Sequence, residues 1–403
     1  MFDSKKVGPL FCCFLKATTV LTLAVLLSPA LQQKTWAQTA SVASKAVAGP
    51  DILTLTNGDQ LRGKLLSESN GTVTFHSDGA GDLTLTWAKI KSIRTSQRFA
   101  VIQKGQHISR KTPDAAVPHG AVAIQEGKVS VTSDAQGPAR EISQPDAQYM
   151  VEEGAYSKEI HSNPGWGQGW NGALSAGLAD VQATQNSHTF TGAANFVRTV
   201  PAVSWLDPRN RTTANLAIAY GSLSQPGTAT AKTNIFHADA EHDWFLSPRL
   251  YALVDTSFDH NYSQGLSLQQ IYGGGFGYVV FKKPKQELDL KGDIHYERQS
   301  FGNTPGVVPP VYTPSRSLIG LDAGDNYVAT LVHGIVFNQG LVVTPAFNTP
   351  SAFSALATTS LVFPVYKRLG FNLSALDDFL NNPAYGSKKN SFQFSAGITY
   401  TLK

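Results

Sequence analysis

Groups that can ionise recur at every second position in one segment of the chain. The set is His237, Asp239, Glu241 and Asp243. A β-strand has a period of two residues, so these side chains would share one face. Imidazole and carboxylate groups at this spacing can bind a divalent metal, and Asp255, Asp259 and His260 follow nearby. The alternative, which we favour, is a polar wall with ion pairs between strands, and we expect no metal and no cofactor.

The same alternation is clearer between residues 286 and 299. One parity carries Glu287, Asp289, Lys291, Asp293, His295 and Glu297. The other parity carries Leu288, Leu290, Gly292, Ile294 and Tyr296. This pattern predicts a strand with one charged face and one apolar face.

Two further groups were considered for catalysis or binding. His161-Ser162-Asn163 contains the residue types of outer-membrane phospholipases, but it lies in a Pro- and Gly-rich stretch and lacks a surrounding motif. A catalytic triad is defined by geometry, which a tripeptide does not supply. Asp377-Asp378 and Lys388-Lys389 flank one expected loop and can hold cations or phosphates, or simply be solvated. We therefore expect no enzyme.

The end of the chain indicates the element that positions these residues. Residues 391–402 alternate strictly, with Phe392, Phe394, Ala396, Ile398, Tyr400 and Leu402 on one face. A bare strand at the chain end would leave an open edge unless it pairs with an earlier strand and closes a barrel. We therefore predict an all-β chain whose C-terminal part is an antiparallel transmembrane β-barrel.

About twelve long strands are expected in residues 170–403. Their ranges are roughly 170–180, 189–200, 211–221, 231–243, 249–260, 268–281, 286–299, 326–338, 341–348, 354–363, 368–378 and 391–402. Short connections, such as Asn338-Gln339-Gly340, alternate with longer ones, such as 181–188 and 300–325, as in bacterial barrels. Charge is costly in hydrocarbon, so the charged faces should line the lumen. The predicted lining residues are Glu287, Asp289, Lys291, Asp293, His295, Glu297, His237, Asp239 and Glu241.

Residues 170–403 also resemble the DUF481 family of salt-induced outer-membrane proteins. The resemblance rests on Asn215–Tyr220, on the glycine-aromatic strand Tyr272–Tyr278, and on Asn381–Lys389 leading into Ile398-Thr399-Tyr400. It implies a barrel with a stress-related role, and the family supplies no established catalytic residues. Tyr400 lies three residues before the end, so we expect the barrel-assembly machinery to recognise Tyr400 and Leu402.

The N-terminal part divides into four segments. Residues 1–37 resemble a secretory signal peptide cleaved after Ala37, with an uncleaved anchor as the alternative. Residues 38–50 and 154–169 read as linkers. Residues 51–153 predict a small SH3-like β-domain in the periplasm, either duplicated or irregularly extended.

Composition limits the function further. The chain has 403 residues and a formal net charge of +4, with scattered basic residues, so we expect no nucleic-acid binding. Both cysteines precede residue 37, which leaves no disulfide in the mature chain.

The sequence predicts a non-enzymatic outer-membrane barrel that is structural or pore-forming. The alternatives are an outer-membrane lipid hydrolase and an envelope scaffold or adhesin acting through its loops. Expected partners are outer-membrane lipids and, through residues 51–153, peptidoglycan or a periplasmic protein.

Overall fold

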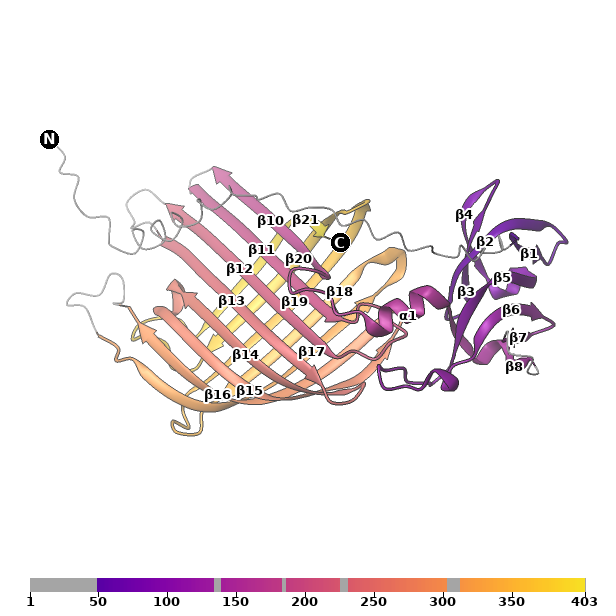
Figure 1. Ribbon diagram of the computed structural model, residues 1–403. Coiled ribbons are helices and arrows are strands. Elements are labelled where there is room, and N and C mark those ends of the chain that lie inside the picture. The colour runs from indigo at the N-terminus through magenta and orange to yellow at the C-terminus, as the bar shows by residue number, and fades with distance from the viewer. Residues whose placement is uncertain (1–48, 134–138, 183–185, 225–230, 303–311, 403) are drawn as a thin grey trace, which may run out of the picture. The chain divides into compact units, whose positions relative to one another are not determined.

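The structure is a computed structural model that describes residues 49–133, 139–182, 186–224, 231–302 and 312–402 (Figure 1). The expected signal peptide, nearly all of the 38–50 linker and residues 303–311 of the expected 300–325 loop lie outside these residues. Within the described ranges, no helix is long and apolar enough to cross a membrane.

The N-terminal region is an antiparallel sheet of nine strands. These are β1 (Asp51–Leu55), β2 (Gln60–Ser69), β3 (Thr72–Ser77), β4 (Gly81–Thr86), β5 (Ile90–Gln103), β6 (His119–Gln125), β7 (Lys128–Thr132), β8 (Arg140–Ser143) and β9 (Ala147–Glu152). Their order is β4-β3-β2-β1-β5-β6-β7-β8, and β9 pairs with β2 and β5. One hydrophobic cluster, which includes Leu53, Phe75, Val122 and Val129, holds both halves of the sheet together.

The two halves repeat the same pattern of pairing. In the first half, β1 lies between β2 and the first part of β5; in the second, the last part of β5 lies between β6 and β9. A single turn of 3-10 helix precedes β5 (Trp87–Lys89) and β9 (Gln144–Asp146). The β2–β3 and β6–β7 turns both use a residue pair with positive φ ending in glycine, which tight hairpins require. A duplication would produce such an arrangement, and the duplication stays a prediction. The classification of this domain as SH3-like also stays a prediction.

Glu68 is a buried acid in this sheet. Its side chain is 1% exposed, and Oε1 accepts a hydrogen bond from the backbone N–H of Gly71 at 2.8 Å. Burial disfavours the charged carboxylate and raises the pKa of Glu68 to about 7, although the hydrogen bond from Gly71 opposes the shift. The domain therefore holds a carboxyl group that titrates near neutral pH.

A helix lies within the segment predicted to be a linker. Helix α1 spans Glu153–His161, and the side chain of Glu152 caps its first turn by accepting from Gly154 N and Ala155 N. Tyr156 and Ile160, four residues apart, are its buried residues. Four glycines and one proline in 154–169 indicated a linker, whereas the cap and the apolar spacing make its first part, as far as His161, helical.

The C-terminal region is a closed barrel of twelve strands, each paired with its neighbours in chain order (Figure 1). The strands are β10 (Trp170–Gln182), β11 (Asn186–Val200), β12 (Asn210–Ser224), β13 (Ala231–Phe245), β14 (Leu250–Asn261), β15 (Leu266–Lys283), β16 (Gln286–Phe301), β17 (Arg316–Thr330), β18 (Val336–Pro345), β19 (Phe353–Tyr366), β20 (Leu369–Leu380) and β21 (Asn390–Leu402). The last strand pairs with the first, from Gly172–Leu402 to Ala176–Ile398. The predicted all-β fold and twelve-stranded barrel are therefore confirmed.

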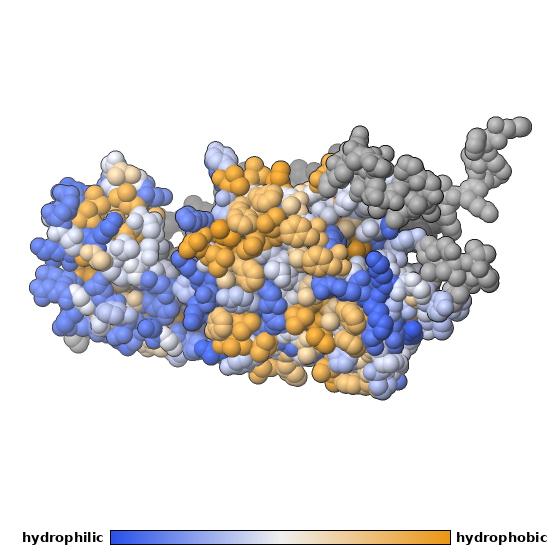
Figure 2. All heavy atoms as spheres, turned by 180° about the vertical axis from the view of Figure 1, so that it is seen from behind, coloured by the Kyte–Doolittle hydropathy of each residue, from blue (hydrophilic) through white to orange (hydrophobic). Residues whose placement is uncertain are grey.

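The outside of the barrel is apolar. Phe392, Phe394 and Ile398 on β21 are 65%, 63% and 65% exposed, and Leu290 and Ile294 on β16 are also exposed. Figure 2 shows large hydrophobic areas over the outer surface of the strands. Such a surface is stable where it contacts lipid rather than water.

One strand and one turn were placed wrongly from the sequence. Strand β17 begins at Arg316, not near residue 326, and the predicted turn Asn338-Gln339-Gly340 lies inside β18. The actual turn is at His333 and Gly334, which both have positive φ. Asn338 resembled a turn residue, but in the strand its Nδ2 donates to Ser360 Oγ at 3.1 Å.

Two connections also differ from the prediction. The expected loop 181–188 is short, since β10 and β11 pair as far as Gln182–Asn186. The expected 300–325 loop is reduced to residues 302–315 because β17 begins early.

Candidate functional site in the barrel interior

All nine predicted lining residues lie on the strand face opposite the exposed apolar one. On β16 the odd positions from 289 to 299 are buried or half-buried, whereas Leu290, Ile294 and Tyr296 are exposed. On β13 the odd positions from 235 to 243 are likewise the more buried set. Because the strands close into a barrel, this face points into the interior. Their role in permeation stays a prediction.

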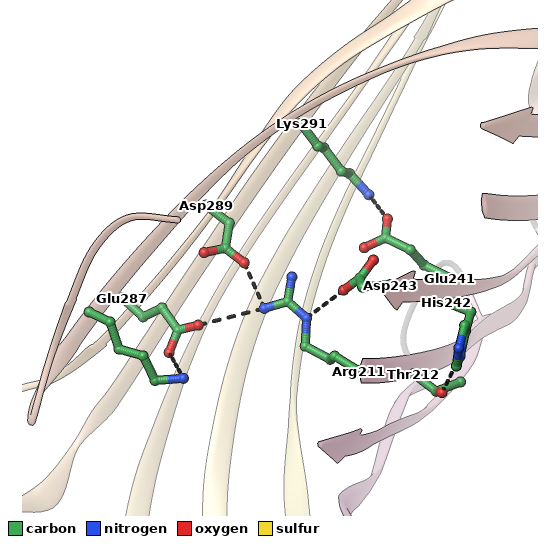
Figure 3. A network of polar contacts seen from close by, with 9 residues as sticks. Arg211, Thr212, Glu241, His242, Asp243, Glu287, Asp289 and Lys291 are labelled. Carbon is green, nitrogen blue, oxygen red and sulfur yellow. Dashed lines mark hydrogen bonds and ion pairs between the residues drawn. The ribbon is translucent and has the colours of Figure 1, made fainter. Parts of the chain in front are cut away.

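Arg211 at the start of β12 is the centre of one polar network (Figure 3). Its Nε donates to Asp243 Oδ2 at 2.7 Å, and its Nη1 lies 2.6 Å from Asp289 Oδ2. A third carboxylate, that of Glu287, lies 3.6 Å from Nη1. The guanidinium also stacks over the Tyr251 ring at 5.0 Å. One cation therefore joins β12, β13 and β16 and partly neutralises three acids.

A second group lies further along the same wall. Lys291 Nζ lies 2.5 Å from Glu241 Oε2, so β16 is joined to β13 inside the barrel (Figure 3). His237 lies between two carboxylates, with Nδ1 2.5 Å from Asp259 Oδ1 and Nε2 2.9 Å from Asp239 Oδ1. These contacts correspond to the predicted ion pairs between strands.

A third group has a composition suited to metal binding. Asp293 and His295 on β16 and Asp322 on β17 offer ligand atoms that all lie within 4.8 Å of one another. Among the described residues, the metal candidates from the sequence, His237 to Asp243, do not form such a group.

The remaining candidates from the sequence have ordinary structural contacts. His161 ends α1, and its Nδ1 lies 2.8 Å from the Ser157 carbonyl oxygen. In the described parts of the chain, no hydrogen bond joins the His161 and Ser162 side chains. His260 Nδ1 lies 2.9 Å from the Ser267 carbonyl oxygen.

Asp378 and Lys389, which belong to the groups expected to hold cations or phosphates or to be solvated, contact amide side chains. The Asp378 carboxylate accepts a hydrogen bond from Asn261 Nδ2 at 2.8 Å, whereas Lys389 Nζ donates to Asn381 Oδ1 at 3.1 Å. Asp378 therefore takes part in joining β20 to the β14–β15 connection.

Sequence analysis missed Arg211, Tyr251 and Asp322. Arg211 is the first residue of the expected strand 211–221, and its residue type and position alone indicate no role. Asp322 fell in the expected 300–325 loop. The sequence could have indicated these residues through their odd or even position in each strand, which shows whether a side chain faces inward. For Asp322 this was not possible, because the predicted strand began after it.

A closed barrel with an apolar outside and a charged inside defines a class of protein. In a bilayer every backbone polar group must be satisfied internally, which a closed barrel achieves. This chain is therefore an outer-membrane β-barrel protein. It belongs to the DUF481 family, because residues 174–402 match the family described as "Protein of unknown function, DUF481".

Comparison with solved structures returns other barrels with low similarity. The chain is 13% identical to the translocator domain of the autotransporter NalP from Neisseria meningitidis, covering 57% of this chain and 87% of that one, with a TM-score of 0.32. It is 11% identical to an outer-membrane channel from Pseudomonas putida F1, covering 60% and 100%, with a TM-score of 0.33. No curated protein matches the chain.

Proposed function

We propose that this protein is a non-enzymatic pore of the outer membrane whose acidic interior favours cations. The observation that carries the proposal is the excess of carboxylates on the inner face. The inner carboxylates are Asp239, Glu241, Asp243, Asp255, Asp259, Glu287, Asp289, Asp293, Glu297 and Asp322. On β12 to β17 the described inner cations are Arg211, Lys282, Lys291 and Arg316, and the first three are already paired with carboxylates.

The distribution of side-chain size around the wall also supports a passage. The long charged side chains lie on consecutive strands, β12 to β17. The inner face of β18 to β21 and of β10 carries mostly uncharged side chains, and several small polar ones hydrogen-bond to one another: Asn338–Ser360, Ser374–Ser395 and Ser175–Thr399. When short side chains on one side of the barrel face long ones on the other, the interior is wider than when long side chains line both sides. An acidic wall of this kind attracts cations and repels anions.

The contacts of His237 support the non-enzymatic part of the proposal. Both ring nitrogens face carboxylates, so neither is directed at a serine hydroxyl. A lipid hydrolase needs a nucleophile within hydrogen-bond reach of its base.

The ends of the barrel support a periplasmic position for the N-terminal domain. Strand β10 begins where β21 ends. The same end carries two-residue connections at 284–285 and 367–368, and short turns face the periplasm in bacterial barrels. In that position the nine-stranded sheet can contact peptidoglycan or a periplasmic protein.

Planar-bilayer recording of the full-length protein tests the proposal. A KCl gradient should give a reversal potential of the sign expected for cations. Asp239→Asn together with Asp259→Asn should reduce this selectivity, because both carboxylates are half-exposed inside the barrel. Asp59→Asn in the exposed β1–β2 hairpin is the matched control and should change nothing. Absence of conductance would leave a structural barrel, and anion selectivity would contradict the electrostatic reasoning.

A further inference from the structure

Three potential metal ligands meet inside the barrel at one point of the β16–β17 pair. Asp293 and Asp322 face each other directly in the strand register, and His295 is two residues along β16 on the same face. Their side chains are 2%, 10% and 0% exposed, in the order Asp293, Asp322 and His295. The geometry of two adjacent strands therefore fixes the group.

The distances between the ligand atoms suit a bound ion. His295 Nδ1 lies 3.8 Å from Asp293 Oδ1 and 3.5 Å from Asp322 Oδ1. A tetrahedral ion with ligands at about 2.1 Å separates its ligand atoms by roughly 3.4 Å. Small side-chain rotations would bring all three atoms into coordination.

His295 is buried without a hydrogen bond. Among the described residues, neither ring nitrogen has a hydrogen-bond partner, and the same holds for Asp293 Oδ1 and Asp322 Oδ1. A buried polar group that lacks a partner costs free energy. The unpartnered Nδ1 is directed at the two carboxylates, as expected for a histidine that binds a metal together with them.

Two glycines provide the space in which these groups lie. A Cβ at Gly320 would be 2.8 Å from His295 Nε2. A Cβ at Gly273 would be 2.6 Å from Asp293 Oδ1 and 2.5 Å from Asp255 Oδ1. A residue larger than glycine at 320 would therefore block the His295 imidazole. A larger residue at 273 would block the carboxylates of Asp293 and Asp255.

The local charge is negative and only partly balanced by protein cations. Within the described part of the chain, no ion pair joins Lys or Arg to Asp255, Asp293, Glu297 or Asp322. The nearby cation Lys291 is paired with Glu241. Carboxylates gathered in a dry interior require a cation or protons.

We propose that Asp293, His295 and Asp322 bind one divalent transition-metal ion, with Zn²⁺ as the reference ion. A nitrogen ligand favours Zn²⁺ over Mg²⁺ and Ca²⁺, which prefer all-oxygen sites. Glu297 is a positioning residue: its Oε2 lies 3.9 Å from His295 Nε2, so it can orient the ring as outer carboxylates do in metal sites. The ion joins β16 to β17 and offsets the acidic charge at this point.

Metal analysis of the folded, full-length protein in detergent tests this site. After chelation and reloading with Zn²⁺, the wild type should retain about one equivalent by mass spectrometry. Loading with Co²⁺ should give visible absorption bands typical of a mixed nitrogen and oxygen site. His295→Gln and Asp322→Asn should weaken binding more than ~100-fold, and Glu297→Gln about 10–100-fold.

His260→Gln is the matched control, because His260 lies on β14 and bonds to a backbone carbonyl. It should leave binding unchanged, and a mobility difference between boiled and unboiled samples shows that each variant is folded. Failure of the wild type to retain Zn²⁺ or Co²⁺ would overturn the proposal. Retention of the ion by both His295→Gln and Asp322→Asn would also overturn it, and neither result depends on conductance.

Discussion

Replacing Arg211 with Gln should destabilise the barrel more than any change at an exposed charge. Arg211 forms ion pairs with Asp243 and Asp289, whose side chains are 1% and 4% exposed. Removing one member of a buried ion pair leaves the other charge uncompensated, which costs about 3–5 kcal/mol. Loss of the stacking over Tyr251 adds a smaller term of about 0.5–2 kcal/mol.

Urea unfolding of the barrel in lipid vesicles measures the effect. The folded fraction is read from the mobility of unboiled samples, and the free energy of unfolding is extrapolated linearly to zero urea. Lys282→Gln is the matched control: Lys282 pairs with Glu287 in the same network, but its side chain is 60% exposed. Exposed pairs contribute at most about 1 kcal/mol, so this variant should unfold almost like the wild type.

A double variant separates charge from packing. Adding Asp243→Asn to Arg211→Gln removes one uncompensated charge and should recover part of the lost stability. If Arg211→Gln and Lys282→Gln lose equal amounts, below about 1 kcal/mol, the interior is hydrated and the reasoning fails.

Three other predictions concern different parts of the structure. Ile398→Lys on the lipid-facing side should destabilise the barrel by up to about 2–4 kcal/mol in the same urea assay, and an equal cost for a lumen-facing Ser395→Lys would count against the assignment of faces. Gly277→Ala should cost about 1–3 kcal/mol, because the new Cβ would lie 2.1 Å from the Tyr251 ring; wild-type stability would show that the ring is free to move. Glu68 has a folded-state pKa of about 7, above its ordinary 4.5. As pH rises, the unfolded chain therefore releases this proton before the folded chain does. The free energy of unfolding of the N-terminal sheet should fall by about 3 kcal/mol between pH 4.5 and pH 7. Pulse proteolysis of the full-length protein in urea at pH 5 and pH 8 should show this loss, and Glu68→Gln should abolish it; an identical loss in both proteins would assign it to another group.

The barrel was predictable because each membrane strand must have one apolar and one polar face, and this requirement shows in a short stretch of sequence. One face of each strand must be apolar and the other polar, so alternation in a segment such as 286–299 identifies both the strand and its orientation. The same constraint hid β17. Leu318 points inward, where it packs with Ala346 and Ala352, and Ile319 points outward, so two apolar residues in succession obscured the period of two.

The interior site was only partly predictable for a related reason. Parity shows which side chains share a face, but it does not show which strands bring them together. The pairing of Asp293 with Asp322 depends on the register of β16 against β17. The sequence did not reveal that register because the start of β17 was placed near residue 326 instead of at Arg316. Likewise the three acids around Arg211 come from two other strands, so no spacing in the sequence indicates that network.

The strand pair that closes the barrel has a consequence for its mechanics. The β10–β21 ladder runs only from Gly172–Leu402 to Ala176–Ile398, whereas β11 and β12 pair from Asn186–Ser224 to Val200–Asn210. A shorter ladder has fewer backbone hydrogen bonds to break, and no ion pair crosses this one among the described residues. The β10–β21 seam is therefore the most weakly paired part of the described barrel wall, and we expect it to part first under lateral strain.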